Sequence, residues 1–300
     1  MTHQTRLFVP AITPFHTDLS VDTTRFVAHC KLLLEDGADG IAPLGTTSEA
    51  TSMSVTERMS ALDALVDAGI PAARLIPGTG CSALPDSVAL TRHALAHGVR
   101  GTLTLPPFFY KPVSPDGLFA SYARLIEAVG SDSLRLYLYH IPQMTGVGIT
   151  LDLIGRLTNE FPGIVAGLKD SSGNWDNTAA VIAAFPGIET YSASEALLVR
   201  NVVAGGAGCI SASANVNAAG IMALIRALGT PDETARLEAV GVIRAFFEQV
   251  PLIPAIKATI ARRLSDPIYA ITRPPLMRLD ASHDAAIVRA CALCFGGNTP

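Results

Sequence analysis

Short apolar runs alternate with longer helical patterns along most of this 300-residue chain. Eight of the runs are bounded by turn residues, which is typical of buried strands. They cover 7–12, 40–44, 75–78, 101–105, 135–139, 165–169, 189–192 and 208–211. Strands that alternate with helices favour a parallel sheet covered by helices. Eight such units in roughly 220 residues predict an α/β fold closed into a (β/α)8 barrel, the TIM barrel.

The helical patterns carry start and stop signals of their own. They cover 22–36, 56–68, 85–96, 115–129, 151–160, 176–185 and 194–204. Ser54 and Glu57 have the spacing of a capping box, Thr150 is placed as an N-cap, and Gly130 follows a helix end. After the eighth strand the chain is helical, over 218–228, 231–249, 252–263 and 282–294. The first of these completes a barrel, so we divide the chain into a barrel domain, 1–229, and a C-terminal helical extension, 230–300.

Composition excludes several classes of function. The chain is 49% hydrophobic and 16% charged, and its net charge of −4 gives no reason to expect nucleic acid or an anionic membrane as a partner. Average domains are about 25% charged, so the low value favours extra buried surface such as a subunit interface. The start of the chain lacks the pattern of a secretory signal, and no apolar run approaches the roughly 20 residues of a membrane span. We expect a soluble, cytoplasmic protein.

Two spacings typical of metal ligands are weak on their own. Five scattered cysteines argue against a disulfide framework. Cys291 and Cys294 form a single CxxC pair in an apolar helical stretch, which favours buried thiols over zinc. His93 and His97 are four residues apart and would share a helix face. The sequence shows no third ligand beside them, so it favours an ordinary surface helix.

Lys169 ends the sixth predicted strand and is followed directly by an Asp-Ser-Ser-Gly turn. In α/β barrels the functional groups lie at the carboxyl ends of the strands. Burial lowers the pKa of an amine, and a neutral amine can attack a ketone to form a Schiff base. The other lysines, Lys31, Lys111 and Lys257, do not end a predicted strand. The alternative is a strand-end lysine whose amine extends to solvent.

Two more strand ends carry suitable groups. The loop Gly45–Glu49, of sequence GTTSE, follows the second strand, and successive backbone N–H groups in such a loop can bind a carboxylate. A plain turn is equally consistent with this loop. Tyr137 and Tyr139 lie on one side of the fifth strand, where a tyrosine near a lysine amine can relay protons. A core tyrosine with a satisfied hydroxyl is the alternative.

Together the three strand ends, GTTxE, YxIP and GLKD in this order, resemble the dihydrodipicolinate synthase / N-acetylneuraminate lyase family of class I pyruvate-dependent aldolases. The resemblance extends over nearly the whole chain and includes Val9–Phe15, Pro106–Gly117 and Gly205–Ser211. It implies that Lys169 forms a Schiff base with a 2-keto acid such as pyruvate. It also implies that Tyr139 moves protons during imine formation and carbon–carbon cleavage.

The same resemblance implies further contacts and properties. Thr46 and Thr47, in the loop that begins at Gly45, match the pair that holds the carboxylate of the keto acid, and Thr46 joins the catalytic group. Ile210 matches the residue that packs beside the pyruvate methyl group. The family implies a homotetramer, built as a dimer of dimers, that acts on a small-molecule substrate without a metal or an organic cofactor.

The departures from the family pattern concern the second half of the substrate. Met144 stands where the synthases carry an arginine, and its thioether cannot pair with a carboxylate. Phe108-Phe109 replaces a tyrosine pair, which breaks the proton relay unless the adjacent Tyr110 moves by one position. Ser48 replaces a glycine, and Ser192–Glu195 replaces an SGDD-like loop.

We therefore expect a lyase, aldolase or dehydratase that acts on 2-keto-3-deoxy sugar acids, with pyruvate as the keto-acid half. Polar candidates for the changed half of the pocket are His140, Gln143, Ser171, Ser194 and Asn215. One alternative is 4-hydroxy-tetrahydrodipicolinate synthase, which condenses pyruvate with aspartate semialdehyde. A second alternative is a non-catalytic regulator that binds a keto acid.

Overall fold

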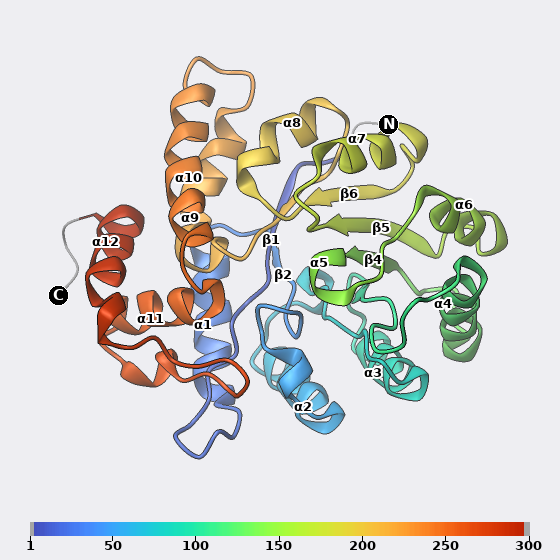
Figure 1. Ribbon diagram of the computed structural model, residues 1–300, viewed down its shortest axis with the longest axis horizontal. Helices are drawn as coiled ribbons and strands as arrows, with labels where there is room; N and C mark the ends of the chain where they lie inside the picture. Colours follow the sequence, from blue (N-terminus) through green and yellow to red (C-terminus); the bar gives the residue numbers. More distant parts are fainter. Residues whose placement is uncertain (1–2, 297–300) are drawn as a thin grey trace.

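A computed structural model describes residues 3–296. Seven parallel strands form one curved sheet in the order β2-β1-β7-β6-β5-β4-β3 (Figure 1). The strands are β1 Arg6–Val9, β2 Gly40–Ile41, β3 Thr102–Thr104, β4 Leu136–His140, β5 Val165–Asp170, β6 Glu189–Ser192 and β7 Gly208–Ile210. The alternation of strands and helices, and with it the barrel predicted from the sequence, is confirmed.

The third predicted strand, 75–78, is the exception. It is not a regular strand but closes the sheet through two parallel bridges, Ile41 with Leu75 and Gly78 with Leu103. Pro77 has no backbone N–H, so a continuous ladder cannot form across this segment. The prediction of a regular strand here was wrong, although the segment does occupy the expected place between β2 and β3.

Helices cover the outer face of the curved sheet (Figure 1). They are α1 Thr23–Glu35, α2 Val55–Asp67, α3 Leu84–Ala96, α4 Pro115–Val129, α5 Pro142–Thr145, α6 Leu151–Glu160, α7 Trp175–Ala184 and α8 Leu198–Val203. The predicted start and stop signals are confirmed. Ser54 and Glu57 form the capping box, the Thr150 side chain accepts from the N–H of Leu153, and Gly130 adopts the left-handed conformation.

The C-terminal extension packs against one side of the barrel (Figure 1). Helix α9, Ala214–Ala227, completes the barrel, and α10 Glu233–Glu248, α11 Leu252–Arg263 and α12 Asp284–Phe295 follow it. Ile12 and Val216 of the barrel share one apolar cluster with Phe247 and Ile256 of the extension. The division at 229/230 stays a prediction, and its outer ends, residues 1–2 and 297–300, lie outside the described residues.

Within residues 3–296, no single helix has both the length and the apolar character needed to cross a bilayer. Helices α10 and α11 reach those criteria only when taken together, as a pair bent by 114°. Both helices contribute side chains to the apolar cluster that they share with the barrel.

A buried ion pair joins the loop after β2 to α11. Lys257 Nζ lies 2.5 Å from Glu49 Oε1 and donates to the carbonyl of Thr13 at 2.8 Å. The second oxygen of Glu49 accepts from the N–H of Arg273 at 2.9 Å. Burial lowers the pKa of Lys257 to about 8, against the opposing effect of the Glu49 charge. The helical pattern around Lys257 did not predict that its amine would be buried.

We predict that Lys257→Met lowers the free energy of unfolding by about 3–5 kcal/mol, because it leaves the Glu49 carboxylate buried without its partner. Chemical denaturation followed by circular dichroism measures the change. The double variant Lys257→Met/Glu49→Gln removes both charges and should lose less than the single variant. Equal denaturation midpoints for Lys257→Met and the wild type would contradict this view of the pair.

Candidate active site

Strands β4 and β5 bring Lys169 and Tyr139 together at the carboxyl end of the barrel. The two residues are direct partners in the parallel register, so their side chains project to the same side. Lys169 Nζ donates to the Tyr139 hydroxyl at 3.2 Å and lies 4.3 Å from the centre of its ring. Lys169 is only 4% exposed. The alternative of a strand-end lysine that extends to solvent therefore does not apply.

Tyr139 lies between Lys169 and the loop after β2. Its hydroxyl is 3.4 Å from Thr46 Oγ1. Burial raises the pKa of Tyr139, but the charge of Lys169 and hydrogen bonds with Thr46, Lys169 and Ser171 outweigh it and hold this pKa below its usual value. A phenol whose pKa is lowered by a neighbouring amine can exchange a proton with that amine or with a bound substrate.

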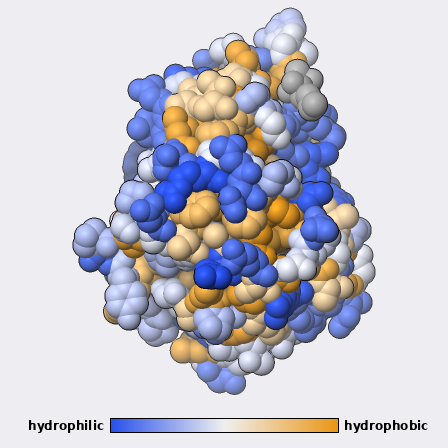
Figure 2. All heavy atoms as spheres, turned by 90° about the vertical axis from the view of Figure 1, so that its right-hand side faces the viewer, coloured by the Kyte–Doolittle hydropathy of each residue, from blue (hydrophilic) through white to orange (hydrophobic). Residues whose placement is uncertain are grey.

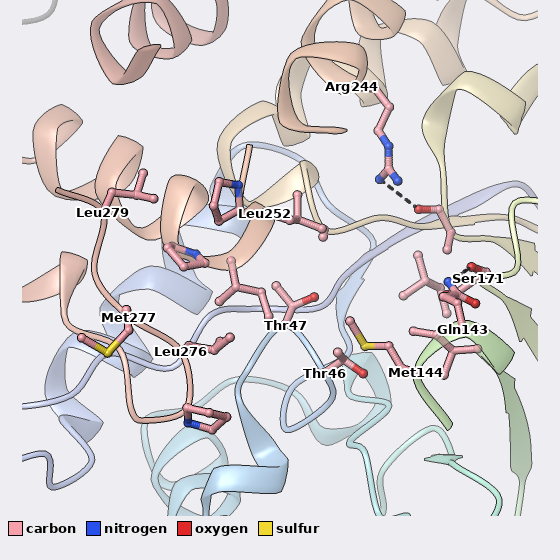
Figure 3. Close-up of a pocket in the computed structure, with 18 of the residues that line it drawn as sticks. Thr46, Thr47, Gln143, Met144, Ser171, Arg244, Leu252, Leu276, Met277 and Leu279 are labelled. Atoms are coloured by element: carbon pink, nitrogen blue, oxygen red, sulfur yellow. Dashed lines mark hydrogen bonds between the residues drawn. The ribbon is translucent and has the colours of Figure 1, made fainter. Parts of the chain in front are cut away.

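These groups lie at one end of a cavity of about 580 Å³. On the barrel side it is lined by Thr46, Thr47, Tyr139, Ile141, Gln143, Met144, Lys169, Ser171, Ala193, Ile210 and Ala212. The other side consists of Arg244, Pro251–Pro254, Pro275–Asp280 and His283 of the C-terminal extension. Figure 3 shows Leu252 and Leu276 near Thr47, Met277 and Leu279 farther out on the side of the C-terminal extension, and Arg244 reaching in from α10.

Comparisons with known proteins agree with this geometry. A sequence model of the Dihydrodipicolinate synthetase family matches residues 3–292. The chain belongs to this family. An uncharacterized DapA-like lyase of Chloroflexus aurantiacus is 34% identical over 291 residues, which cover 96% of each chain. A 4-hydroxy-tetrahydrodipicolinate synthase of Synechococcus sp. is 30% identical over 292 residues, with 96% of this chain and 94% of the relative covered.

The crystal structure of dihydrodipicolinate synthase from Agrobacterium tumefaciens superposes with a TM-score of 0.88 at 31% identity. The match covers 97% of this chain and 100% of that one. Family membership and this likeness make the chain a lyase of the class I aldolase group. The relatives differ in their named activities, so they do not fix the substrate of this member.

The remaining residues that the family resemblance predicts as keto-acid contacts lie at or beside the cavity. Ile210 lines it beside Lys169, and Thr47 is buried next to Thr46. Gly45 borders a small adjoining space together with Thr46 and Tyr139. The structure thus brings the predicted keto-acid contacts together around one amine.

Gln143 and Ser171 also lie at this cavity and contact each other. Gln143 Nε2 donates to the carbonyl of Ser171 at 2.6 Å. Figure 3 shows the two side by side, next to Met144. Both retain their place as candidates for substrate contacts.

Three polar candidates lie elsewhere in the described structure, so we no longer assign them to the substrate. His140 alternates with Tyr139 along β4 and faces away from the cavity; its Nδ1 accepts from the N–H of Ile149 at 2.9 Å. Ser194 is not among the residues that line the cavity, although its neighbour Ala193 is, and its carbonyl accepts from the Ser192 hydroxyl. Asn215 is buried and anchors the segment that follows β1, because its side chain accepts from the N–H of Ile12 and donates to the Pro10 carbonyl.

Tyr137 points toward the opposite end of the barrel from Tyr139. Its hydroxyl donates to Glu189 Oε2 at 2.8 Å, and Tyr191 donates to the same oxygen at 2.9 Å. Arg100 completes this network with a bond of 2.6 Å to Glu189 Oε1. Burial raises the pKa of Tyr137 well above its usual value. Tyr137 is therefore a core tyrosine, and only Tyr139 is placed to serve the amine.

Ser48 and Glu195, which depart from the family pattern in two loops, make buried hydrogen bonds and do not line the cavity. Ser48 Oγ donates to the Ala11 carbonyl at 2.5 Å and accepts from the N–H of Leu44 at 2.8 Å. Glu195 is buried and accepts from the hydroxyls of Ser211 and Ser213. Of the segment Ser192–Glu195, Ala193 is the residue that lines the cavity.

The contribution of the C-terminal extension to the cavity was missed from the sequence. Arg244, Leu252 and Leu276 are 75 to 107 positions beyond Lys169, and nothing in their local patterns indicates that they face it. The available signals were indirect: Pro251 stands between α10 and α11, and a further pair of prolines stands at 274–275. Such breaks mark a loop, and barrel loops at this end line the site.

We predict that Tyr139→Phe slows the exchange of pyruvate methyl protons with solvent deuterium by roughly 10²–10⁴-fold, the usual contribution of a positioned proton-transfer group. Proton NMR follows the exchange without knowledge of the second substrate. Tyr137→Phe is the matched control, since it removes a phenol from the other end of the same strand. An exchange rate in Tyr139→Phe close to that of Tyr137→Phe would exclude Tyr139 as the relay.

Proposed function

We propose that this protein is a Schiff-base lyase that cleaves, or forms by condensation, 2-keto-3-deoxy acids with pyruvate as the keto-acid half. The observation that carries the proposal is the buried amine of Lys169, 3.2 Å from the Tyr139 phenol at the end of a cavity large enough for a small acid. A lysine amine beside a proton-transfer group is the minimum needed for imine chemistry.

The reaction begins when Lys169 Nζ attacks the C2 ketone and water leaves, giving a protonated imine. Thr46 and Thr47 lie where they can hold the substrate carboxylate beside the imine. Tyr139 takes the proton of the C4 hydroxyl as the C3–C4 bond breaks, and the electron pair of that bond moves into the imine. The aldehyde leaves, the resulting enamine is protonated at C3, and hydrolysis releases pyruvate and the free amine.

The same imine also supports dehydration. Loss of a C3 proton followed by departure of the C4 hydroxyl as water would give the unsaturated acid instead of two fragments. In both reactions the protonated imine on Lys169 accepts the electrons and Tyr139 moves the proton. We therefore propose that catalysis uses no metal and no organic cofactor.

The far side of the cavity bears on the identity of the second half of the substrate. Arg244 Nε donates to Glu248 Oε1 at 2.8 Å, whereas its Nη1 makes only long hydrogen bonds, of 3.4 Å, to the Ala193 carbonyl and to Ser211 Oγ. A guanidinium has five N–H donors, so Arg244 retains donors for a substrate. The surrounding side chains are mostly apolar, with Leu252 and Leu276 among them. This lining favours a short aldehyde half with one polar or anionic end over a long polyol.

The synthase reaction is the second candidate, since a relative named 4-hydroxy-tetrahydrodipicolinate synthase is 30% identical to this chain. Met144 stands at the position where the resemblance leads us to expect a carboxylate-binding arginine. Arg244 also lines the cavity and carries a guanidinium. It belongs to α10, however, and so enters the cavity from a different element than Met144 does. Aspartate semialdehyde therefore has to be tested beside the 2-keto-3-deoxy acids.

We predict pyruvate release from one or more 2-keto-3-deoxy acids, measured with lactate dehydrogenase and NADH, and its loss in Lys169→Ala. In Arg244→Gln the KM for that substrate should rise by about 10-fold or more, because a charged hydrogen bond contributes about 1.5–3 kcal/mol. The solvent exchange of pyruvate protons should stay unchanged in Arg244→Gln, since that step needs only the keto-acid half.

Two outcomes would contradict the prediction. Turnover confined to pyruvate plus aspartate semialdehyde would identify a synthase. The absence of turnover with every acid, in a protein that still binds pyruvate, would favour the non-catalytic regulator.

We further propose that the chain forms a tetramer, a dimer of dimers. Phe109 and Tyr110 follow β3 with exposed fractions of 74% and 83%, and their rings contact each other edge to face at 5.4 Å. Figure 2 shows apolar side chains exposed between hydrophilic groups on one face of the molecule. Exposed aromatic side chains of this kind are enriched at protein interfaces.

Light scattering after size exclusion should give a mass four times 31.4 kDa, about 126 kDa. Phe109→Asp/Tyr110→Asp should reduce the mass, because the charges oppose burial of the loop. Arg124→Asp, a surface change on α4, is the control and should leave it unchanged. A wild-type mass near 31.4 kDa would show a monomer and refute the assembly.

A further inference from the structure

We propose that Asp63, His93 and His97 form a site for a divalent transition-metal ion of the Zn²⁺ type on the outside of the barrel. Asp63 belongs to α2, His93 to α3, and His97 caps the end of α3. Their ligand atoms lie within 4.8 Å of one another. Within residues 3–296 they are the one group of three such side chains close enough to share an ion.

The geometry points both imidazoles at one carboxylate oxygen. Asp63 Oδ1 lies 2.7 Å from His93 Nε2 and 2.7 Å from His97 Nε2. The two imidazole rings meet edge to face, with centres 5.0 Å apart. Zinc takes two histidine nitrogens and a carboxylate oxygen at about 2.0–2.2 Å, with water as a fourth ligand. At tetrahedral angles these bond lengths place two ligand atoms about 3.3 Å apart, so an ion would enter by moving the oxygen roughly 0.6 Å away from each nitrogen, which these partly exposed side chains permit.

A second observation concerns His93 itself. Its Nε2 is buried and, among the described residues, has no hydrogen bond of normal geometry, although it is close to Asp63. A buried ring nitrogen without a well-aligned partner is costly, and in the tautomer that leaves Nε2 unprotonated its lone pair would bind a cation. The two histidines also belong to the last turn and the cap of α3, where the negative end of the helix dipole favours positive charge.

The third ligand comes from a different helix, which is why the sequence did not reveal it. Helices α2 and α3 lie side by side on the barrel surface (Figure 1). Residues four apart share a helix face, so the spacing of His93 and His97 predicts only two ligands. The packing of α2 against α3 supplies Asp63 and turns a two-ligand face into a three-ligand cluster.

The position in the fold indicates a structural role. Helices of a parallel barrel run opposite to the strands, so the last turn of α3 lies toward the amino ends of the strands, away from Lys169. An ion bound there would join α2 to α3 without contact with the substrate. The proposal is therefore independent of the function proposed above, and an inactive protein could still bind the ion.

Isothermal titration of tag-free, EDTA-dialysed protein with ZnCl2 tests the site. We expect one ion per subunit and, at about 100 times the Kd, a rise in Tm of roughly 5 °C. His93→Gln and His97→Gln keep a hydrogen-bonding group near Asp63 but should each abolish the saturable uptake and the Tm shift. His16→Gln is the matched control, since His16 faces one aspartate, Asp22, at 3.4 Å without a second imidazole.

Three results would overturn the site. One is a wild-type protein that takes up no Zn²⁺ saturably, which would leave Asp63 and the histidines as an ordinary ion pair. Another is uptake that survives in both glutamine variants. The third is a thiolate charge-transfer band after Co²⁺ substitution, which would place the ion at a cysteine pair such as Cys291 and Cys294.

Discussion

The buried ion pair between Lys257 and Glu49 holds together the two parts of the chain that line the cavity. Glu49 ends the loop that carries Thr46 and Thr47, and Lys257 lies on α11 of the C-terminal extension. Glu49 and Leu44, at either end of this loop, both have positive φ angles, of 58° and 61°. Such conformations cost about 1–3 kcal/mol each and persist only where surrounding contacts fix them. The ion pair supplies such contacts and fixes the loop relative to the wall opposite.

The two buried lysines differ in their partners, and this difference separates their roles. Lys257 faces a carboxylate, which stabilises the charged amine and suits a structural group. Lys169 faces the phenol of Tyr139, which can give or take a proton as the chemistry requires. Burial alone therefore does not identify the reactive amine in this chain; its hydrogen-bond partner and its place at a strand end do.

The fold and the inner half of the site could be predicted because local pattern determines them. Apolar runs gave the strands, and β4 and β5 placed Tyr139 beside Lys169 through ordinary parallel pairing. The same alternation already placed His140 on the opposite face, a signal that the choice of substrate contacts overlooked. At 75–78 the apolar composition indicated a strand, but Pro77 removed one ladder donor and only isolated bridges form.

The outer half of the site depends on packing between segments distant in sequence, and no local pattern encodes it. Arg244 reaches the cavity because α10 packs on the barrel, and Asp63 meets two histidines because α2 packs on α3. The roles proposed for Arg244 in substrate choice and for Asp63 in ion binding both depend on these contacts. The residues proposed to bind the keto-acid half of the substrate belong to motifs at strand ends. Those proposed to select its second half depend on how distant segments pack.

The central claim is that Lys169 forms an imine with a keto acid, and trapping with borohydride tests it most directly. The protein is incubated with pyruvate and sodium borohydride, digested and analysed by mass spectrometry. We expect a reduced pyruvyl adduct on the peptide that contains Lys169, and none on Lys257. A folded protein that gives no adduct, or one that is modified at another lysine, would contradict it.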